Sequence, residues 1–156
     1  MDIVKIDVKT VTPTLMGGGV SQNDGIRPSE IKGVMRYWFR ALAGFVFGND
    51  IKALKSLEDK VFGSQARMSP FRINISDENL IIGKLNFSSL PVGTKYLAFV
   101  INLNRHRMDN VILPGSEFAI KFLFRPSIVP SIRNLVVLSF YLASALGGFG
   151  LRTRRG

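Results

Sequence analysis

The sequence lacks cysteine entirely, and among its 156 residues it has a single histidine, His106. Without cysteine there is no thiol catalysis, no thiolate zinc site and no disulfide, and a reducing compartment fits this composition. No group of carboxylates is spaced like a two-metal nuclease centre. We therefore expect a cytoplasmic protein that holds no metal and no cofactor.

Acidic residues are scarce. The chain has 11 Asp and Glu against 21 Lys and Arg, which gives a formal net charge of +10 at pH 7. A charge of this size on one small domain creates a positive field that attracts polyanions. Nucleic acid is therefore the leading class of partner, and an anionic membrane surface is the alternative.

Long hydrophobic runs are also missing. The longest uncharged stretch covers residues 134–151, but its continuous apolar part, residues 135–146, has only 12 residues. A membrane-spanning helix needs about 20. The first residues alternate charged and apolar side chains, which is not the pattern of a signal peptide. We expect a buried core helix in the uncharged stretch and no membrane partner.

The first part of the chain predicts a strand, a loop and a helix. Alternation favours a strand at residues 3–11, and glycine and proline favour a loop at residues 12–27. Pro28 and Ser29 mark the start of a helix, with Ser29 as its cap. The apolar residues of this helix recur at spacings of three and four and predict packing against a sheet; they are Ile31, Met35, Trp38, Leu42 and Phe45.

The rest of the chain predicts a short helix, three strands and a long helix. The short helix covers residues 51–62 and ends at Gly63. Alternating apolar residues then predict strands at 71–75, 97–103 and 118–124. We expect the last two strands to form a hairpin whose connection is an exposed basic loop, and the long helix to cover residues 131–146 with most of its circumference buried.

This order of elements predicts an α+β protein. Strand, helix, strands and helix follow one another as in the ferredoxin-like (RRM-like) βαββαβ fold, and we expect its last strand to be lacking. We expect one domain over residues 1–156. The aromatic signature of ordinary RNA-recognition motifs is absent from the middle strands, so stacking of bases on the open sheet face is not the expected mode of binding.

Three cations form a regular row on the first helix. Lys32, Arg36 and Arg40 recur every four residues and so lie on one face, beside the apolar one. Such a row is able to follow the phosphates of a nucleic acid, and a solvated helix face gives the same pattern. Gly33 is unusual inside a helix, since it costs about 1 kcal/mol relative to alanine. It suggests close approach by a strand, a loop or the backbone of a ligand.

The last ten residues, GGFGLRTRRG, combine two residue types that bind anions. Glycines allow successive backbone N–H groups to converge on one anion, and arginines grip phosphate oxygens in pairs. The spacing is not that of a nucleotide-binding P-loop. The alternative is a helix that ends at glycine and continues as a disordered basic tail.

These motifs resemble a known family. The run GGFGLRTRRG after an apolar helix resembles the C-terminal glycine-rich loop of the RAMP superfamily, the repeat-associated RNA-binding proteins of CRISPR systems. TPTLMGGG, at residues 12–19, and IRPSEIKGVMRYWFRAL, at residues 26–42, look like the first subunits of Cmr complexes, the type III-B RNA-guided effectors. Phe62, Gly63 and Ser64 are similar to a short loop of RAMP proteins.

The resemblance implies a non-catalytic RNA-binding subunit of antiviral defence. Such a subunit grips the 3′ region of guide RNA and the backbone of target RNA, with other Cmr subunits as further partners. Guide pairing reads the sequence, so the protein supplies backbone contacts and shape. The candidate RNA contacts are Lys32, Arg36, Arg40, Gly147, Gly148, Gly150, Arg152, Arg154 and Arg155.

Three further residues have weaker claims. Arg27 and Arg67 are secondary candidates for RNA contact, and Trp38 is a candidate for stacking on a base, although its place on the apolar side of the helix favours the core. Members of the subunit family are generally longer, with a second ferredoxin-like domain. We therefore expect this chain to lack that domain and the last strand of the first one, leaving a fragment, a short variant or a unit completed by a separate polypeptide.

Two other functions stay open. Some RAMP relatives cut guide-RNA precursors with a histidine base, and His106, between Arg105 and Arg107, is the only histidine available for a metal-independent ribonuclease. No second acid or base is spaced to join it. A purely structural capping subunit, which gains RNA affinity only in the assembled complex, is the other alternative.

Overall fold

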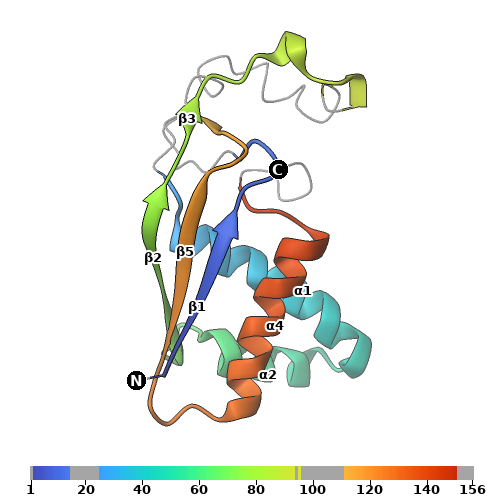
Figure 1. Cartoon of the computed structure of the whole chain (residues 1–156). Coiled ribbons are helices and arrows are strands. Elements are labelled where there is room, and N and C mark those ends of the chain that lie inside the picture. Colours follow the sequence, from blue (N-terminus) through green and yellow to red (C-terminus); the bar gives the residue numbers. More distant parts are fainter. Residues whose placement is uncertain (1, 15–24, 94, 96–110, 151–156) are drawn as a thin grey trace.

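The computed structural model describes residues 2–14, 25–93, 95 and 111–150 (Figure 1). His106 and the arginines at 152, 154 and 155 lie outside the described residues. The strand predicted at 97–103 and most of the predicted basic loop lie outside them as well. Their predicted roles stay predictions.

A three-stranded antiparallel sheet forms one layer of the molecule. It consists of β1 (Asp2–Lys9), β5 (Glu117–Phe124) and β2 (Phe71–Asn79), in the order β1-β5-β2. Phe122 of β5 lies opposite Val4 of β1 on one edge and opposite Ile73 of β2 on the other. Both edges of β5 are therefore paired, and the predicted hairpin between residues 97–103 and 118–124 is wrong.

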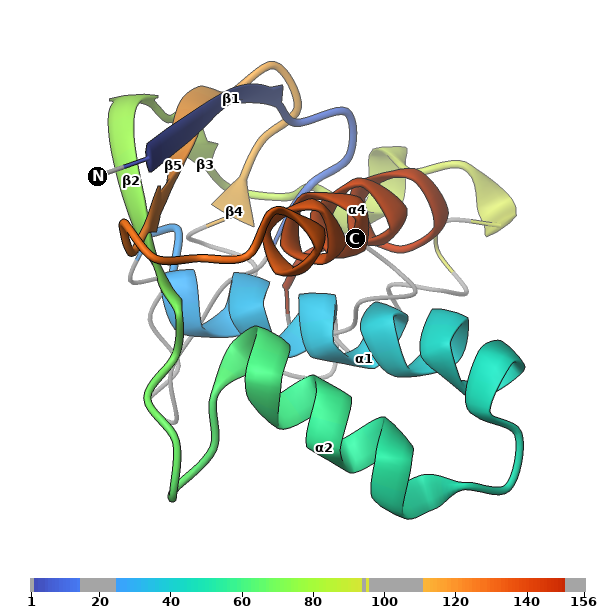
Figure 2. The same cartoon turned by 90° about the horizontal axis from the view of Figure 1, so that it is seen from below.

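The helices lie on one face of this sheet. Figure 2 shows α1 (Pro28–Phe47), α2 (Ile51–Phe62) and α4 (Pro130–Leu146) on the same side of the strands, with α2 farthest from them. The helices α1 and α4 follow β1 and β5 along the chain. With the strand order above, this arrangement is the ferredoxin-like fold that the sequence predicts.

Period-two alternation on the strands produces the layer. On β5, Phe118, Ile120, Phe122 and Phe124 are buried, because they point toward the helices. On the opposite face of the sheet, Lys5 of β1 lies next to Lys121 of β5. The apolar face is thus covered and the charged face is left to solvent.

A chain of aromatic rings connects the sheet to the helices. Phe39 of α1 contacts Phe62 of α2, which contacts Phe71 of β2, at centroid distances of 5.5 and 5.9 Å. Phe122 of β5 contacts Phe140 of α4 at 5.5 Å. A fully buried phenylalanine contributes about 1.5–3 kcal/mol from burial alone, so these rings add substantially to the stability of the core.

The start of α1 differs from the prediction. Pro28 takes the first helical position and Arg27 is the N-cap, with no side-chain cap. Ser29 therefore lies inside the first turn, and its predicted capping role is wrong.

The buried face of α1 is also rotated from the predicted one. Its buried residues are Ile31, Val34, Met35, Phe39 and Ala43. Leu42 is 37% exposed and Phe45 is 93% exposed. Most of the buried residues are spaced by four from Ile31. Phe45, predicted from its spacing of three from Leu42, therefore lies on another side of the helix.

The long helix α4 begins at Pro130 and ends at Leu146, close to the predicted bounds. Its buried residues are Val136, Ser139, Phe140 and Ala143, whereas Tyr141 is 66% exposed. The prediction that most of its circumference is buried is therefore wrong for the outer side. Among the described residues, no helix has the length and hydrophobicity needed to cross a membrane.

Short elements form a second, two-stranded sheet. Strands β3 (Ile82–Gly83) and β4 (Val111–Ile112) pair with each other, and a short helical turn, η1 (Phe87–Ser89), follows β3. Thr14 forms an isolated antiparallel bridge with Ile112. This bridge fixes the beginning of the glycine-rich segment that follows β1.

Candidate nucleic-acid-binding surface

The motifs at the two ends of the sequence come together in the fold. Thr12 and Thr14, which open the N-terminal motif, line one small pocket with Gly147 and Gly148, and its volume is about 150 Å³. The backbone of Thr14 is held there, because its N–H donates to the carbonyl of Ile112 at 2.8 Å. The pocket thus joins two segments that are far apart in the chain.

Packing sets the path of the glycine-rich loop as it leaves α4. The N–H of Gly147 donates to the carbonyl of Ala143 at 3.2 Å. A side chain at Gly147 would place its Cβ 2.5 Å from Nε1 of Trp38 on α1, far inside contact distance. Phe149 stacks on Phe140 with ring centroids 5.5 Å apart. The described part of the loop, Gly147 and Phe149, therefore packs against both long helices.

Two candidate residues, Trp38 and Gly150, lie at this loop in distinct settings. Trp38 is half-buried, with its indole nitrogen against Gly147. Its ring therefore supports the start of the glycine-rich loop. The sequence suggests either stacking on a base or a place in the core, and this role lies between the two. Gly150 has φ of +123°, a conformation that residues with side chains rarely adopt.

The cation row on α1 is bound by an acid from α2. Glu58, only 7% exposed, accepts from Arg36 Nη1 at 3.0 Å and from Arg40 Nε and Nη2 at 2.8 and 2.9 Å. One carboxylate thus holds two guanidinium groups. The row is neither a solvated helix face nor three free cations.

The other contacts of the row tie α1 to the turn after α2. Arg36 Nη2 donates to the carbonyls of Phe62 and Gly63. Lys32 Nζ donates to Ser69 Oγ at 2.7 Å and lies over the ring of Phe71. Burial, followed by the charge of Arg36, lowers the pKa of Lys32 below its ordinary value. Lys32 and Arg36 are therefore both held by partners inside the protein.

Arg40 keeps the most capacity to bind an external anion. Its side chain is 55% exposed, against 29% for Arg36. Glu58 takes only the edge formed by Nε and Nη2, and among the described residues Nη1 has no hydrogen-bond partner. Its free guanidinium edge is able to donate to a pair of phosphate oxygens.

The secondary candidates, Arg27 and Arg67, lie on two different segments. Arg27 caps the start of α1 and faces Glu30, with 4.0 Å between Nη1 and Oε1. Arg67 is exposed in the turn between α2 and β2. Within the described residues no group of His, Cys, Asp or Glu is placed to hold a metal ion.

Sequence reasoning missed Glu58. The signal was present, because Glu58 is spaced four residues from Leu54 and three from Val61 and therefore shares their inward side of α2. An acid on the apolar side of a helix predicts a cationic partner. Three basic residues on the preceding helix were the available partners.

Replacement of Glu58 by glutamine is expected to lower the free energy of unfolding by about 1–3 kcal/mol at pH 7, since it removes the charge that offsets Arg36 and Arg40. The hydrogen bond from Arg40 is the main cause that holds the pKa of Glu58 below its ordinary value of 4.5, and burial opposes it. A lowered pKa stabilises the fold above pH 4.5 and ceases to do so as pH falls through the lowered value. Urea unfolding between pH 3 and 7 measures this.

The matched control is Glu117→Gln. Glu117 is exposed and pairs with Lys9 at 2.8 Å, so its loss is expected to cost less than about 1 kcal/mol. Equal losses in the two variants, or the same acid dependence in Glu58→Gln and the parent, would contradict a structural network at Glu58.

The comparisons with known proteins agree with the motifs. The family model of the RAMP superfamily matches residues 7–156. The chain is 32% identical to CRISPR system Cmr subunit Cmr1-2 of Pyrococcus furiosus, over 96% of this chain and 89% of that protein. It is 35% identical to subunit Cmr1-1 of the same organism, over 100% of this chain but 46% of that protein.

Solved structures show the same fold. The crystal structure of Cmr1 from Pyrococcus furiosus in its apo form superposes with a TM-score of 0.81 at 33% identity, over all of this chain and 47% of that one. A chain of the type III-B Cmr-beta complex bound to cognate target RNA and AMPPnP, in the presence of ssDNA, gives a TM-score of 0.65 at 16% identity, over 97% of this chain and 52% of that one. This chain therefore spans about half the length of several similar proteins.

Proposed function

We propose, from the premise that the chain belongs to the RAMP superfamily, that it is an RNA-binding subunit of a type III-B CRISPR Cmr complex. In this role it grips the backbone of guide RNA, in its 3′ region, and of target RNA, and it performs no chemistry. Similarity to the Cmr1 subunits of Pyrococcus furiosus supports this assignment. A chain of the same fold belongs to a Cmr-beta complex bound to target RNA, which agrees with it.

The observation that carries the proposal is the meeting of the two terminal motifs. Thr12 and Thr14 share a pocket with Gly147 and Gly148, so the described parts of the two motifs lie side by side. The second of these segments contains three arginines within four positions. Together with a net charge of +10, this gives a local concentration of phosphate-binding groups.

The surface suits backbone contacts better than base reading. Arg40 offers a free guanidinium edge, and Trp38 is held against the glycine-rich loop rather than left open as a stacking platform. Contacts to phosphates position an RNA without selecting its sequence. In a guided complex, base pairing supplies the selection.

The purified chain is expected to bind single-stranded RNA with little sequence preference. If three to five phosphates are neutralised, log affinity should fall with log salt at a slope of roughly −2 to −3.5, using about −0.7 per phosphate. Fluorescence anisotropy with two RNAs of unrelated sequence, over a range of salt concentrations, measures both properties. A slope near zero, or binding of one RNA alone, would refute backbone grip. Binding only within the assembled complex would favour a structural cap.

We expect no RNA cleavage by the parent or by His106→Ala, with or without divalent metal. General acid–base cleavage needs a positioned acid and base, and the sequence supplies one histidine. Labelled guide and target RNA, incubated for hours and resolved on denaturing gels, provide the measurement. Products with 2′,3′-cyclic phosphate ends that disappear in His106→Ala would establish a ribonuclease instead.

A further inference from the structure

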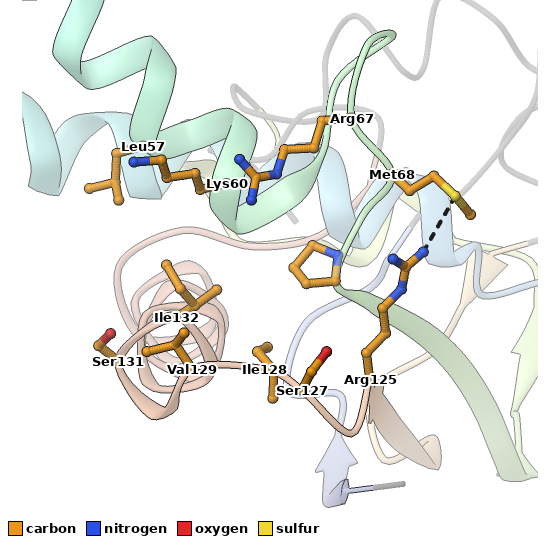
Figure 3. Close-up of a pocket in the computed structure, with 11 residues that line it drawn as sticks. Leu57, Lys60, Arg67, Met68, Arg125, Ser127, Ile128, Val129, Ser131 and Ile132 are labelled. Carbon is orange, nitrogen blue, oxygen red and sulfur yellow. Dashed lines mark hydrogen bonds between the residues drawn. The ribbon is translucent and has the colours of Figure 1, made fainter.

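A second basic site lies on the far side of the turn that follows α2. It is a pocket of about 550 Å³ between the end of α2, this turn, the end of β5 and the start of α4 (Figure 3). Ser69 in the turn binds Lys32, so the turn separates the pocket from the α1 row. The pocket is distinct from the one that joins Thr14 to the glycine-rich loop.

Three cations line this pocket, and none of the described residues that line it is acidic. They are Lys60 from α2, Arg67 from the turn and Arg125, which directly follows β5. Figure 3 shows Lys60 and Arg67 on the α2 side and Arg125 beside Met68 on the opposite side. Among the described residues, the side chains of Lys60 and Arg67 have no hydrogen-bond partner, and Arg125 donates only to the weak acceptor Met68 Sδ, at 3.5 Å. The three charges thus have no counter-ion in the part of the chain that the structure describes.

The first turn of α4 adds a fourth positive element. The N-cap, Val129, provides no side-chain cap, and the turn contains no acidic residue. Ser131, in this turn, lines the pocket. Pro130 has no N–H, and the N–H groups of Ile132 and Arg133 donate to the carbonyl of Val129, so among the described residues the N–H of Ser131 is the donor left in this turn. This N–H and the helix dipole favour an anion at this position.

The walls between these charges are apolar. They are formed by Leu57, Met68, Pro70, Ile128 and Ile132. A pocket of several hundred Å³ with an apolar wall and a few charged groups is of the size and kind that holds a small organic ligand. Inorganic phosphate would use the cations but would leave the apolar wall unused.

We propose that this pocket binds a nucleotide through its phosphate, with Arg67, Arg125 and the start of α4 on the phosphate and the apolar wall against the nucleoside. The nucleotide is either free or a unit of a bound RNA, and in the second case the proposal rests on the proposed function. An RNA that runs along α1 reaches the pocket by crossing the turn at Ser69, which Lys32 binds from the α1 side.

Calorimetric titration of the full chain with AMP, adenosine and inorganic phosphate tests the pocket. We expect AMP to bind, inorganic phosphate to bind more weakly, and adenosine to give no signal. Arg67→Gln combined with Arg125→Gln should weaken AMP binding at least about tenfold, since charge-assisted hydrogen bonds are lost. The same charge change at Lys52 and Lys55, exposed on α2, should alter it less than about twofold.

A second variant separates binding from folding. Ser131→Glu places an acid in the first turn of α4, where it should keep or raise the thermal stability. The same charge repels a phosphate, so AMP binding should be lost while the protein stays folded. AMP binding that is unchanged in Ser131→Glu and in the double arginine variant would overturn the proposal.

Titration of the same variants with RNA distinguishes the two sources. If the nucleotide is a unit of RNA, AMP should compete with RNA, and the arginine pair should reduce RNA affinity more than the lysine pair does. AMP binding without competition identifies a free nucleotide. RNA binding without AMP binding overturns the proposed nucleotide site and leaves the proposed function intact. AMP binding without RNA binding supports the nucleotide site and contradicts the proposed function.

Discussion

Replacement of Gly63 by alanine is expected to lower the free energy of unfolding by more than about 3 kcal/mol, the range of strained backbone combined with overpacking. Gly63 has φ of +80° and ψ of 164°, a region open essentially to glycine alone. A Cβ there would lie 2.6 Å from the N of Ser69 and 2.9 Å from the carbonyl oxygen of Arg67. These are backbone atoms, so the turn has to open to admit a methyl group.

The damage should spread beyond the turn, because the carbonyl of Gly63 accepts from Arg36 and the turn holds Ser69 against Lys32. Urea unfolding followed by circular dichroism gives the stability. Gly33→Ala is the matched control, since a Cβ at Gly33 meets no described atom within 4 Å. That variant should gain about 0.5–1 kcal/mol from helix propensity. A Gly63→Ala variant as stable as the parent would show that the turn is not a fixed element.

Local patterns predict the elements of this chain well. Alternation places β1, β2 and β5, and glycines 63 and 147 mark the ends of α2 and α4. These features depend on neighbours within a few residues, which a sequence displays directly. The bounds of the elements accordingly agree with the prediction to within one or two residues for most of them.

The pairing between strands could not be predicted from local patterns. Alternation defines the inward face of β5 but not its partners, so the predicted hairpin was wrong even though the strand itself was right. The central place of β5 arises because β1 arrives from the other end of the chain, with Asp2 opposite Phe124. Such contacts are set by the topology of the whole domain.

The candidate site shows the same division. The basic row on α1 follows from the sequence, since a spacing of four residues defines one helix face. Its partner Glu58 comes from another helix, and only the packing of α1 on α2 makes it a structural network. Likewise, the close contact with Trp38 explains why a glycine stands at position 147, and this explanation does not depend on anion binding.

Replacement of Arg152, Arg154 and Arg155 together by alanine is expected to weaken RNA binding at least about tenfold at moderate salt. The loss should be nearly equal for every RNA sequence, and the salt slope should become shallower by roughly 1 to 2 units, because phosphate contacts are removed and base contacts are not. Stability should stay within about 0.5 kcal/mol per site if the arginines contact solvent or RNA alone. Anisotropy and urea unfolding measure the two quantities.

The control is an equal charge change on the surface, with Lys52, Lys55 and Lys95 replaced by alanine. Gly148→Val tests the glycines separately, and it is preferred to a change at Gly147, where the clash with Trp38 would disturb the fold itself. If the loop cradles phosphates, Gly148→Val weakens RNA binding by blocking backbone approach, with no change in charge. If the loop is only a basic tail, Gly148→Val binds like the parent, and the arginine and lysine triples lose the same affinity. RNA affinity falls with salt concentration whether the loop is a site or the protein only has a general basic field. The two are therefore distinguished by comparing the arginine and lysine triple variants at a single salt concentration.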